Sequence, residues 1–406
     1  MEKDTAAPRP SIVKQFFINT LVTTPLQSNV SKTTMRLAVA AFYFCQGLCF
    51  ASWASRIPDI KTKLNLSEGE LGSILLALPL GQLIMIPVSG RLVTKYGSRT
   101  VLSFAVILYA LELTNIGWAA QGWQLALALF FFGVFGNMCN IAVNTQGVLA
   151  EKIYKRPIMA SFHGAWSMAG FTGALVGLLM INLKMAPRPH FFIVIALALV
   201  ITFIARKYLI PGTTAPAEKK KFFSKPDKIL MQLGLISFCC MAAEGTMFDW
   251  SGVYFKEVVK VPQSLVIVGY ASFMIMMATG RFTVDRIIAR VGRKKMLQAS
   301  GILILVGLMI AVLFPYLITA TLGFLIVGFG VSSVVPTIYS TAIRSTKIPP
   351  GMAIAAVSSI SFLGFLLGPP LIGYIAQLAS LRYSFAVVAL LGFCITIMVS
   401  KLKVMD

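Results

Sequence analysis

Twelve long apolar runs, separated by short polar or Pro/Gly-rich breaks, constrain this 406-residue chain more than any other feature. About 20 apolar residues make one membrane-spanning helix, so twelve runs leave room only for short loops. Charged residues make up 12% of the chain, about half the share in a soluble domain, which excludes an ordinary water-soluble enzyme. We predict an all-α membrane protein whose twelve spans lie at residues 34–55, 68–90, 99–118, 123–146, 157–181, 190–209, 228–252, 264–286, 295–314, 316–342, 351–376 and 382–402.

The basic residues are unevenly distributed along the chain, which holds 36 Lys and Arg against 14 Asp and Glu. If the N-terminus is cytoplasmic, 28 of these basic residues fall in or beside the cytoplasmic segments and 7 fall in the outer loops. Because Lys and Arg concentrate in cytoplasmic loops, we expect both termini in the cytoplasm. The same rule explains the excess of basic residues, so the excess does not indicate that the protein binds nucleic acid. Nucleic-acid binding needs a solvated basic face.

The chain divides into two similar halves. A shift of 195 residues places Gly97 on Gly292, and a shift of 194 places Phe135 on Phe329. Two pseudo-symmetric six-helix bundles in parallel orientation, with a site between them, form a transporter architecture. We expect a cytoplasmic segment at residues 1–33, a first bundle at 34–209, a cytoplasmic linker at 210–227 and a second bundle at 228–402.

Short motifs resemble the major facilitator superfamily. The segment from Gly90 to Arg99 is similar to the Gly-x-x-x-Asp-x-x-Gly-[Arg/x]-[Arg/Lys] loop of that superfamily, with Thr94 in place of the Asp. The second half carries a related stretch after Gly280. The resemblance implies a twelve-helix secondary transporter that works by alternating access. It also implies gating roles for charged residues of these two loops, namely Arg91, Arg99, Asp285 and Arg286.

Two further motifs narrow the resemblance. Residues 53–60 (Trp-Ala-Ser-Arg-Ile-Pro-Asp-Ile) and 162–167 (Phe-His-Gly-Ala-Trp-Ser) resemble a bacterial branch related to fucose-permease-like and rhizopine-permease-like proteins. This resemblance implies a sugar, a polyol or a similar hydroxylated metabolite as the small-molecule solute. We accordingly expect a monomer in the bacterial inner membrane, surrounded by membrane lipid. We expect it to couple transport of the solute to movement of a proton or another ion.

Two acidic residues of the seventh span are candidates for proton coupling, because a charged group persists in hydrocarbon only beside a partner or a wet cavity. Glu244 lies near mid-depth and is predicted to accept a proton or to bind a solute hydroxyl or amine; alternatively it is permanently protonated or paired with a basic residue. Asp249 is five residues nearer the outside. It is a second proton carrier, or it pairs with Arg56 and closes an outer gate.

Polar and aromatic residues of spans one, four and five are candidates for binding the solute. Asn137, Asn140 and Asn144 share one helix face of the fourth span, where they either bond neighbouring helices or line a cavity. His163 is a possible proton relay or a satisfied buried histidine. Trp166 offers a flat apolar wall with one N–H donor, which suits stacking on a sugar-like ring. Trp53 is a further candidate for binding the solute.

Other functional classes remain open alternatives. An exporter of amphipathic drugs or lipids would use the same fold, and the methionine-rich stretch at residues 274–277 fits a wide apolar cavity. A membrane-embedded enzyme or a sensor would need a catalytic cluster or an added soluble domain, and the sequence shows neither. We expect no cofactor and no metal, since two histidines and six scattered cysteines supply no ligand spacing.

Overall fold

The computed structural model describes residues 30–155, 158–211, 228–345 and 350–402. Among these residues, twelve helices are long and apolar enough to cross a membrane, which confirms the predicted fold class. Most of the predicted segment 1–33 and of the predicted linker 210–227 lies outside the described residues.

The helices of the first half are α2 (Lys32–Ala54), α3 (Ile57–Lys63), α4 (Glu68–Leu75), α5 (Ala77–Tyr96), α6 (Ser98–Trp118), α7 (Gly122–Tyr154), α8 (Met159–Asn182), α9 (Pro187–Ala205) and the short η1 (Arg206–Tyr208). Those of the second half are α10 (Lys228–Glu257), η2 (Gln263–Leu265), α11 (Val268–Val291), α12 (Arg293–Leu313), α13 (Leu317–Ser345), α14 (Pro350–Leu378) and α15 (Leu381–Lys401).

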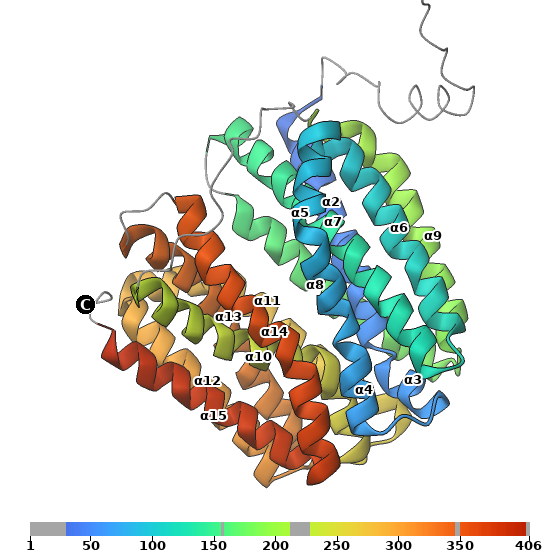
Figure 1. Ribbon diagram of the computed structural model, residues 1–406, viewed down its shortest axis with the longest axis vertical. Coiled ribbons are helices and arrows are strands. Elements are labelled where there is room, and N and C mark those ends of the chain that lie inside the picture. The colour runs from blue at the N-terminus through green and yellow to red at the C-terminus, as the bar shows by residue number, and fades with distance from the viewer. Residues whose placement is uncertain (1–29, 156–157, 212–227, 346–349, 403–406) are drawn as a thin grey trace, which may run out of the picture.

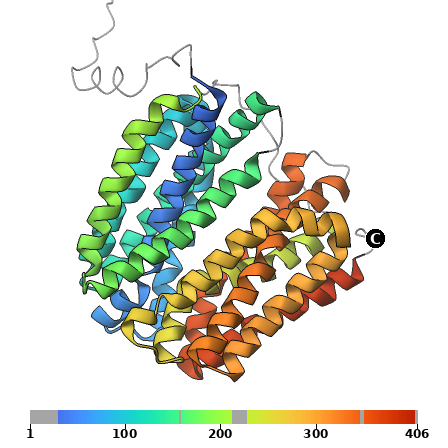
Figure 2. The same cartoon turned by 180° about the vertical axis from the view of Figure 1, so that it is seen from behind.

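The two halves form two bundles, coloured blue to green and yellow to red in Figure 1. They meet at the end of the molecule that carries α3 and α4, and their helices diverge toward the opposite end (Figures 1 and 2). The contacts between the bundles run mainly from α4 to α14, from α8 to α11 and from α3 to α10. We call the end where they meet the α3–α4 end.

The second predicted span is broken into two helices. Ser67 and Glu70 form a capping box at the start of α4, with the Glu70 carboxylate accepting from the Ser67 backbone N–H at 2.9 Å. The break falls at Leu76, directly before α5. Pro79 explains this position, since its ring clashes with the carbonyl four residues earlier and it donates no helical hydrogen bond. Before this break, α4 packs against α14 of the other bundle.

The repeat predicted from the sequence has two counterparts in the structure. Gly97 joins α5 to α6 with φ 81°, and Gly292 joins α11 to α12 with φ 85°, a backbone conformation that favours glycine. A Cβ added at Gly133 would meet the carbonyl oxygen of residue 78 at 2.0 Å, and one added at Gly328 would meet that of residue 273 at 2.3 Å. The crossings α5–α7 and α11–α13 are therefore the same close contact, 195 residues apart.

Candidate functional site

The centre of the interface between the bundles carries an ion pair. Glu244 lies in the middle of α10, is 7% exposed, and its Oε1 is 3.3 Å from Nη2 of Arg281 on α11. Both helices belong to the second bundle. The structure therefore shows Glu244 paired with a basic residue, Arg281, which is one of the alternatives predicted from the sequence.

Arg281 also reaches the first bundle. Its Nη1 donates to the hydroxyl of Ser167 on α8 at 2.7 Å, and its guanidinium carbon lies 5.8 Å from the ring centroid of Trp166. A guanidinium over an aromatic face is attracted by the ring quadrupole. We call Trp166, Ser167, Glu244 and Arg281 the central cluster. Its charged group contacts both bundles in the middle of their helices.

The polar face of α7 leads away from the central cluster along the first bundle. The Tyr43 hydroxyl donates to Oδ1 of Asn144 at 2.8 Å, and Nδ2 of Asn144 donates to Oδ1 of Asn140 at 2.8 Å. His163 lies edge-on to the Tyr43 ring, with the centroids 5.4 Å apart. Asn140 and His163 are exposed although they lie within membrane-spanning helices.

Two predicted solute-binding residues lie elsewhere. Asn137 is 7% exposed and its Oδ1 accepts from the hydroxyl of Ser89 on α5 at 2.8 Å, so it joins two helices of one bundle. Trp53 is 0% exposed. Its side chain belongs to the hydrophobic core, and a role for Trp53 in binding the solute stays a prediction.

The predicted ion pair between Arg56 and Asp249 is absent from the part of the chain that the structure describes. Arg56 is 2% exposed and binds the carboxylate of Asp59 at 2.7 Å, with Nδ1 of His190 at 3.1 Å and the carbonyl of Met185 at 2.9 Å. Asp59 is one helical turn away and satisfies the guanidinium locally. Arg56 therefore braces α3 against α9 within the first bundle, and Asp249 lies buried on α10.

The four predicted loop residues lie at the end where the helices diverge. Arg99 donates to the backbone carbonyls of Arg206 and Lys207, at 3.1 and 3.4 Å. Arg91 and Arg286 are exposed. Asp285 lies within α11, and its side chain is outside what the structure describes. Gating by these four residues stays a prediction.

An aromatic layer adjoins the central cluster on the side of the α3–α4 end. Phe248 lies one turn beyond Glu244 on α10, about 6 Å along the axis, and is 4% exposed. Its ring centroid lies 5.3 Å from that of Phe50 and 5.9 Å from that of Trp166, both of the first bundle. Three aromatic rings of the second bundle surround it at 5.6–6.4 Å, namely Tyr270, Phe273 and Phe365.

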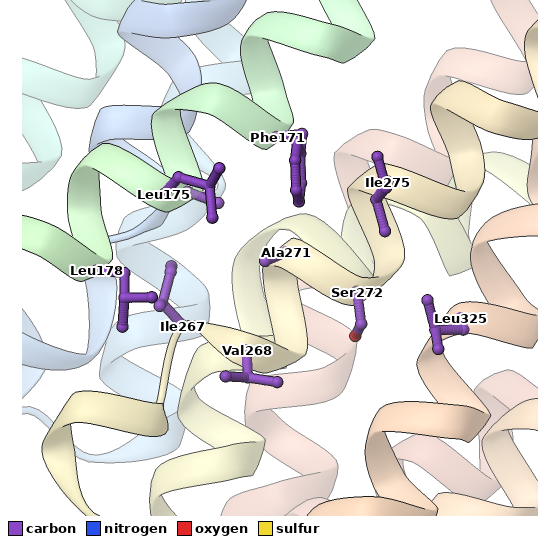
Figure 3. A pocket seen from close by; sticks show the side chains of 10 residues that line it. Phe171, Leu175, Leu178, Ile267, Val268, Ala271, Ser272, Ile275 and Leu325 are labelled. Atoms are coloured by element: carbon purple, nitrogen blue, oxygen red, sulfur yellow. The ribbon is translucent and has the colours of Figure 1, made fainter.

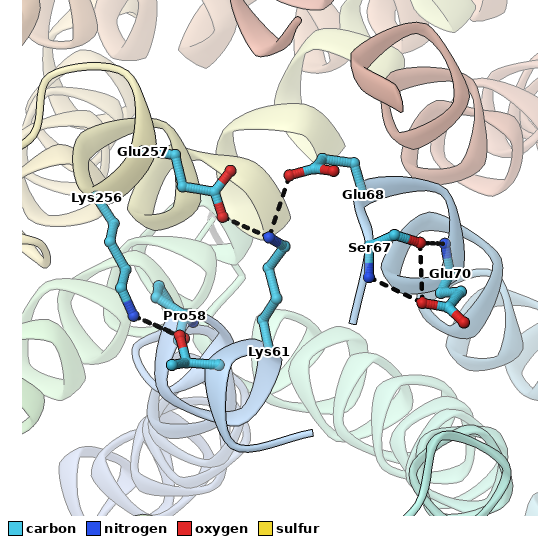
Figure 4. A network of polar contacts seen from close by, with 8 residues as sticks. Pro58, Lys61, Ser67, Glu68, Glu70, Lys256 and Glu257 are labelled. Atoms are coloured by element: carbon cyan, nitrogen blue, oxygen red, sulfur yellow. Dashed lines mark hydrogen bonds and ion pairs between the residues drawn. The ribbon is translucent and has the colours of Figure 1, made fainter. Parts of the chain in front are cut away.

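A polar network closes the α3–α4 end. Lys61 on α3 lies between two carboxylates, that of Glu257 on α10 and that of Glu68 on α4, whose Oε1 is 3.2 Å from Nζ (Figure 4). Lys256 on α10 donates to the carbonyl of Pro58 at 3.4 Å (Figure 4). We call these residues, with Asp59 and its donor Gln263 on η2, the gate network. It ties α3 to the second bundle.

Close backbone packing extends this closure to α4 and α14. A Cβ added at Gly72 would meet the carbonyl oxygen of Pro369 at 2.9 Å, and the hydroxyls of Ser73 and Tyr374 are 2.8 Å apart. An apolar cavity of about 290 Å³ lies beside this closure, between α8 and α11. Phe171, Leu175 and Leu178 face Ile267, Val268 and Ile275 across it (Figure 3).

Arg281, Ser167, Phe248 and Lys61 are functional candidates that the sequence did not identify as such. Arg281 falls near the cytoplasmic end of the predicted span 264–286, where a basic residue is ordinary. In the structure, α11 continues to Val291, so Arg281 lies well inside the helix. The continuation of the helical pattern past residue 286 was the available signal.

Comparison with known proteins gives the family. Residues 37–349 match the Major Facilitator Superfamily. The chain belongs to this superfamily. Its members are secondary transporters, so the chain is a multi-pass membrane transporter and not an enzyme.

Individual relatives and structures agree with this assignment. The chain is 34% identical to an uncharacterized MFS-type transporter of Yersinia pestis, over 86% of this chain and 91% of the relative. It is 27% identical to the membrane protein MosC of Rhizobium meliloti, over 88% and 87%. The structure of the nucleoside transporter NupG superposes with a TM-score of 0.70 at 13% identity, covering 91% of this chain and all of NupG.

Proposed function

We propose that this superfamily member moves a small hydroxylated solute across the membrane together with a proton, and that the central cluster binds the solute. The contact of Arg281 with Glu244 on its own bundle and with Ser167 on the other carries this proposal. A charge placed in hydrocarbon is costly and marks a solute or proton pathway. Because these contacts cross the bundle interface, a group that competes for them changes both binding and the relative position of the bundles.

The contacts support an inward-open state. Under the positive-inside rule, the basic loops support a cytoplasmic position for both termini and a position of the α3–α4 end on the outer face of the bacterial inner membrane. The gate network and the aromatic layer then close the outer side, while Asn140 and His163 are exposed within their membrane-spanning helices. A bacterial homologue of the human lysosomal transporter Spinster, solved in an inward-facing and unoccupied conformation, superposes with a TM-score of 0.70 over 92% of this chain.

Glu244 is the proposed proton carrier. Its ionised carboxylate is held by Arg281 at 3.3 Å, and a proton on Glu244 removes this attraction. The guanidinium is then available to a solute, with Trp166 as a flat wall and Asn140 and Asn144 as amide donors and acceptors for hydroxyl groups. Asp249 stays a second candidate, buried one turn and a half nearer the α3–α4 end.

The test is uptake into liposomes that contain the purified protein. With an imposed pH gradient, a transported sugar-like solute should accumulate, and Glu244→Gln should abolish the accumulation while exchange without a gradient persists. Glu112→Gln is the matched control, because Glu112 is also buried in a membrane-spanning helix but accepts from Asn115 on its own helix at 3.1 Å. Accumulation by Glu244→Gln equal to that of the unchanged protein would reject Glu244 as the carrier.

Export of amphipathic compounds is a second candidate function. The observation in its favour is the cavity between α8 and α11, whose lining is carbon except for the hydroxyl of Ser272 (Figure 3). An exporter predicts that a strain overproducing the protein resists a set of amphipathic drugs. Unchanged resistance across such a set, together with uptake of a hydroxylated solute in liposomes, would reject export and support the first proposal.

A further inference from the structure

The contacts of Arg281 bear on the class of solute that the central cluster takes. An arginine has five N–H donors in a planar fork that fits a carboxylate with two parallel hydrogen bonds. Here Glu244 uses a single contact at 3.3 Å, longer than the usual distance for a charged pair. The other contact goes to a neutral hydroxyl, that of Ser167. The guanidinium is thus held between the bundles by one long ion contact and one neutral hydroxyl. Neither provides the two parallel hydrogen bonds that a better-matched carboxylate can form.

We propose that the solute is a hydroxylated monocarboxylate, and that one proton accompanies it in an electroneutral step. This inference rests on the proposed function and names the substrate class of the same site. In the binding step, a proton from the solvent adds to the Glu244 carboxylate and its ion pair with Arg281 breaks. The carboxylate of the solute then takes that place on the guanidinium. The proton leaves a hydronium ion of the solvent, so one O–H bond breaks as the O–H bond of Glu244 forms, and no other covalent bond changes.

Charge balance explains why the proton and the anion move together. The ionised pair of Glu244 and Arg281 has no net charge. Adding an anionic solute alone would leave one uncompensated negative charge at mid-membrane, which is costly. Adding the proton with it restores a neutral site, with one anion on Arg281 and a neutral Glu244.

The other titratable groups around the pair do not change this balance. Tyr339 on α13 lies within electrostatic range of Glu244 and is itself bonded to Ser358 of α14 at 2.9 Å. Cys240 lies one turn away on α10. His163 on α8 lies within range of Arg281, where a protonated imidazole would add a second positive charge. The proton is therefore assigned to the carboxylate that already contacts the guanidinium.

An aromatic ring beside the pair and an exposed amide of the first bundle account for the hydroxylated body of the solute. Trp166 lies against the guanidinium on one side, and Asn140 on α7 offers a donor and an acceptor. The cationic alternative, an amine solute bound by Glu244, would have to share the cluster with Arg281, and like charges disfavour this arrangement.

Matched pairs of probes test the inference. Purified protein is incubated with D-glycerate, D-gluconate or D-glucuronate, and with the neutral counterparts glycerol, D-sorbitol and D-glucose. D-Glucosamine serves as the cationic probe. We expect an acid of this set to raise the melting temperature, more strongly at pH 6 than at pH 8, since binding needs a proton; the neutral and cationic probes should not.

Transport then tests the stoichiometry. In liposomes, uptake of the stabilising acid should acidify the lumen and should be unaffected when a potassium gradient with valinomycin imposes a membrane potential. Arg281→Gln should weaken binding of the acid about tenfold to hundredfold, as expected for the loss of a charged hydrogen-bonded pair. Arg281→Lys keeps the positive charge but loses the planar guanidinium that can form two parallel hydrogen bonds. If the Gln variant does not fold, this variant tests whether binding of the acid needs those two bonds.

The outcomes separate the two proposals. The carboxylate inference is overturned if a neutral or cationic probe is taken up with protons while none of the acids stabilises the protein or is taken up. Proton-coupled transport would then still stand. Uptake of the acid that follows the imposed potential overturns the electroneutral step. If no probe of any class moves with protons, both proposals fail. Glu112→Gln should behave as the unchanged protein in every arm.

Discussion

The three asparagines of α7 share a helix face but have different roles in the structure. Asn137 is buried against Ser89 of α5, whereas Asn140 is exposed and bonds Asn144 on its own helix. We predict that Asn137→Ala lowers the melting temperature, because a buried Ser89 hydroxyl loses its acceptor at a cost of about 1 kcal/mol or more. Asn140→Ala should leave the melting temperature unchanged and reduce solute uptake.

The two variants are each other's control, and both need the same two measurements, thermal unfolding in detergent and uptake in liposomes. If Asn140→Ala unfolded at a lower temperature than Asn137→Ala, the assignment of Asn140 to the solute path would be wrong. Periodicity placed these residues on one face, but helical spacing contains no information about which part of that face another helix covers.

The sequence identified half of the central cluster. Glu244 and Trp166 were predicted because a carboxylate in an apolar run is costly to retain and because the Trp motif resembles that of a bacterial branch. Their partner Arg281 was not selected, since a basic residue near the end of a predicted span is ordinary and the span was drawn too short. The expected ion pair between Arg56 and Asp249 was inferred from the similar depth of the two residues on two helices. Asp59, three residues along the chain, is nearer to Arg56 and binds it instead.

At the scale of elements, the close crossing of α5 and α7 depends on glycine. A Cβ at Gly133 would lie 2.0 Å from a backbone carbonyl oxygen of α5, whereas one at Gly90, also in a helix, would meet nothing within 4 Å. We predict that Gly133→Ala destabilises the protein by about 1–3 kcal/mol, the usual range for overpacking. Gly90→Ala should be neutral or should stabilise by up to about 1 kcal/mol, because alanine restricts the unfolded chain more.

Thermal unfolding of the two variants checks this prediction, and the pair controls for the change of residue type. Equal melting temperatures would mean that α5 moves away from α7 without cost. The sequence predicted all the long helices through their apolar length. It did not predict α3, because Ile57–Lys63 lies in the polar break after the first predicted span. It did not predict the break between α4 and α5, because that stretch is apolar enough to read as one span.

At the scale of the whole molecule, three successive contacts hold the bundles together from the centre to the α3–α4 end. They are the central cluster, the aromatic layer around Phe248, and the gate network around Lys61. On α10, Glu244, Phe248 and Glu257 belong to these three levels in turn, so one helix carries a residue of each. A change at either end of α10 therefore reaches the other end through a single rigid element.

Opening the gate network should close the opposite side of the bundle interface. Lys61→Gln leaves Glu68 and Glu257 near each other without the ammonium group between them. We expect this change to destabilise the closed α3–α4 end by about 1–2 kcal/mol, between the values for exposed and buried pairs, which shifts the two-state population about tenfold. Lys63→Gln is the control, because Lys63 is on the same helix but donates at 2.9 Å to the carbonyl of Ala119 within the first bundle.

The readout is labelling of Asn140→Cys with a membrane-impermeant maleimide, in right-side-out and in inverted membrane vesicles. If both termini are cytoplasmic and the bundles open inward, as proposed, the exposed position 140 should react in inverted vesicles and little in right-side-out ones. Lys61→Gln should move reactivity toward the right-side-out vesicles, and Lys63→Gln should not. Labelling from the outer face in the otherwise unchanged protein would reverse the proposed orientation. Two rigid bundles that rock about a central contact cannot open one end without closing the other, so a gate network that controls access must change the labelling of position 140. An identical labelling pattern in all variants would show instead that the gate network does not control access to the centre.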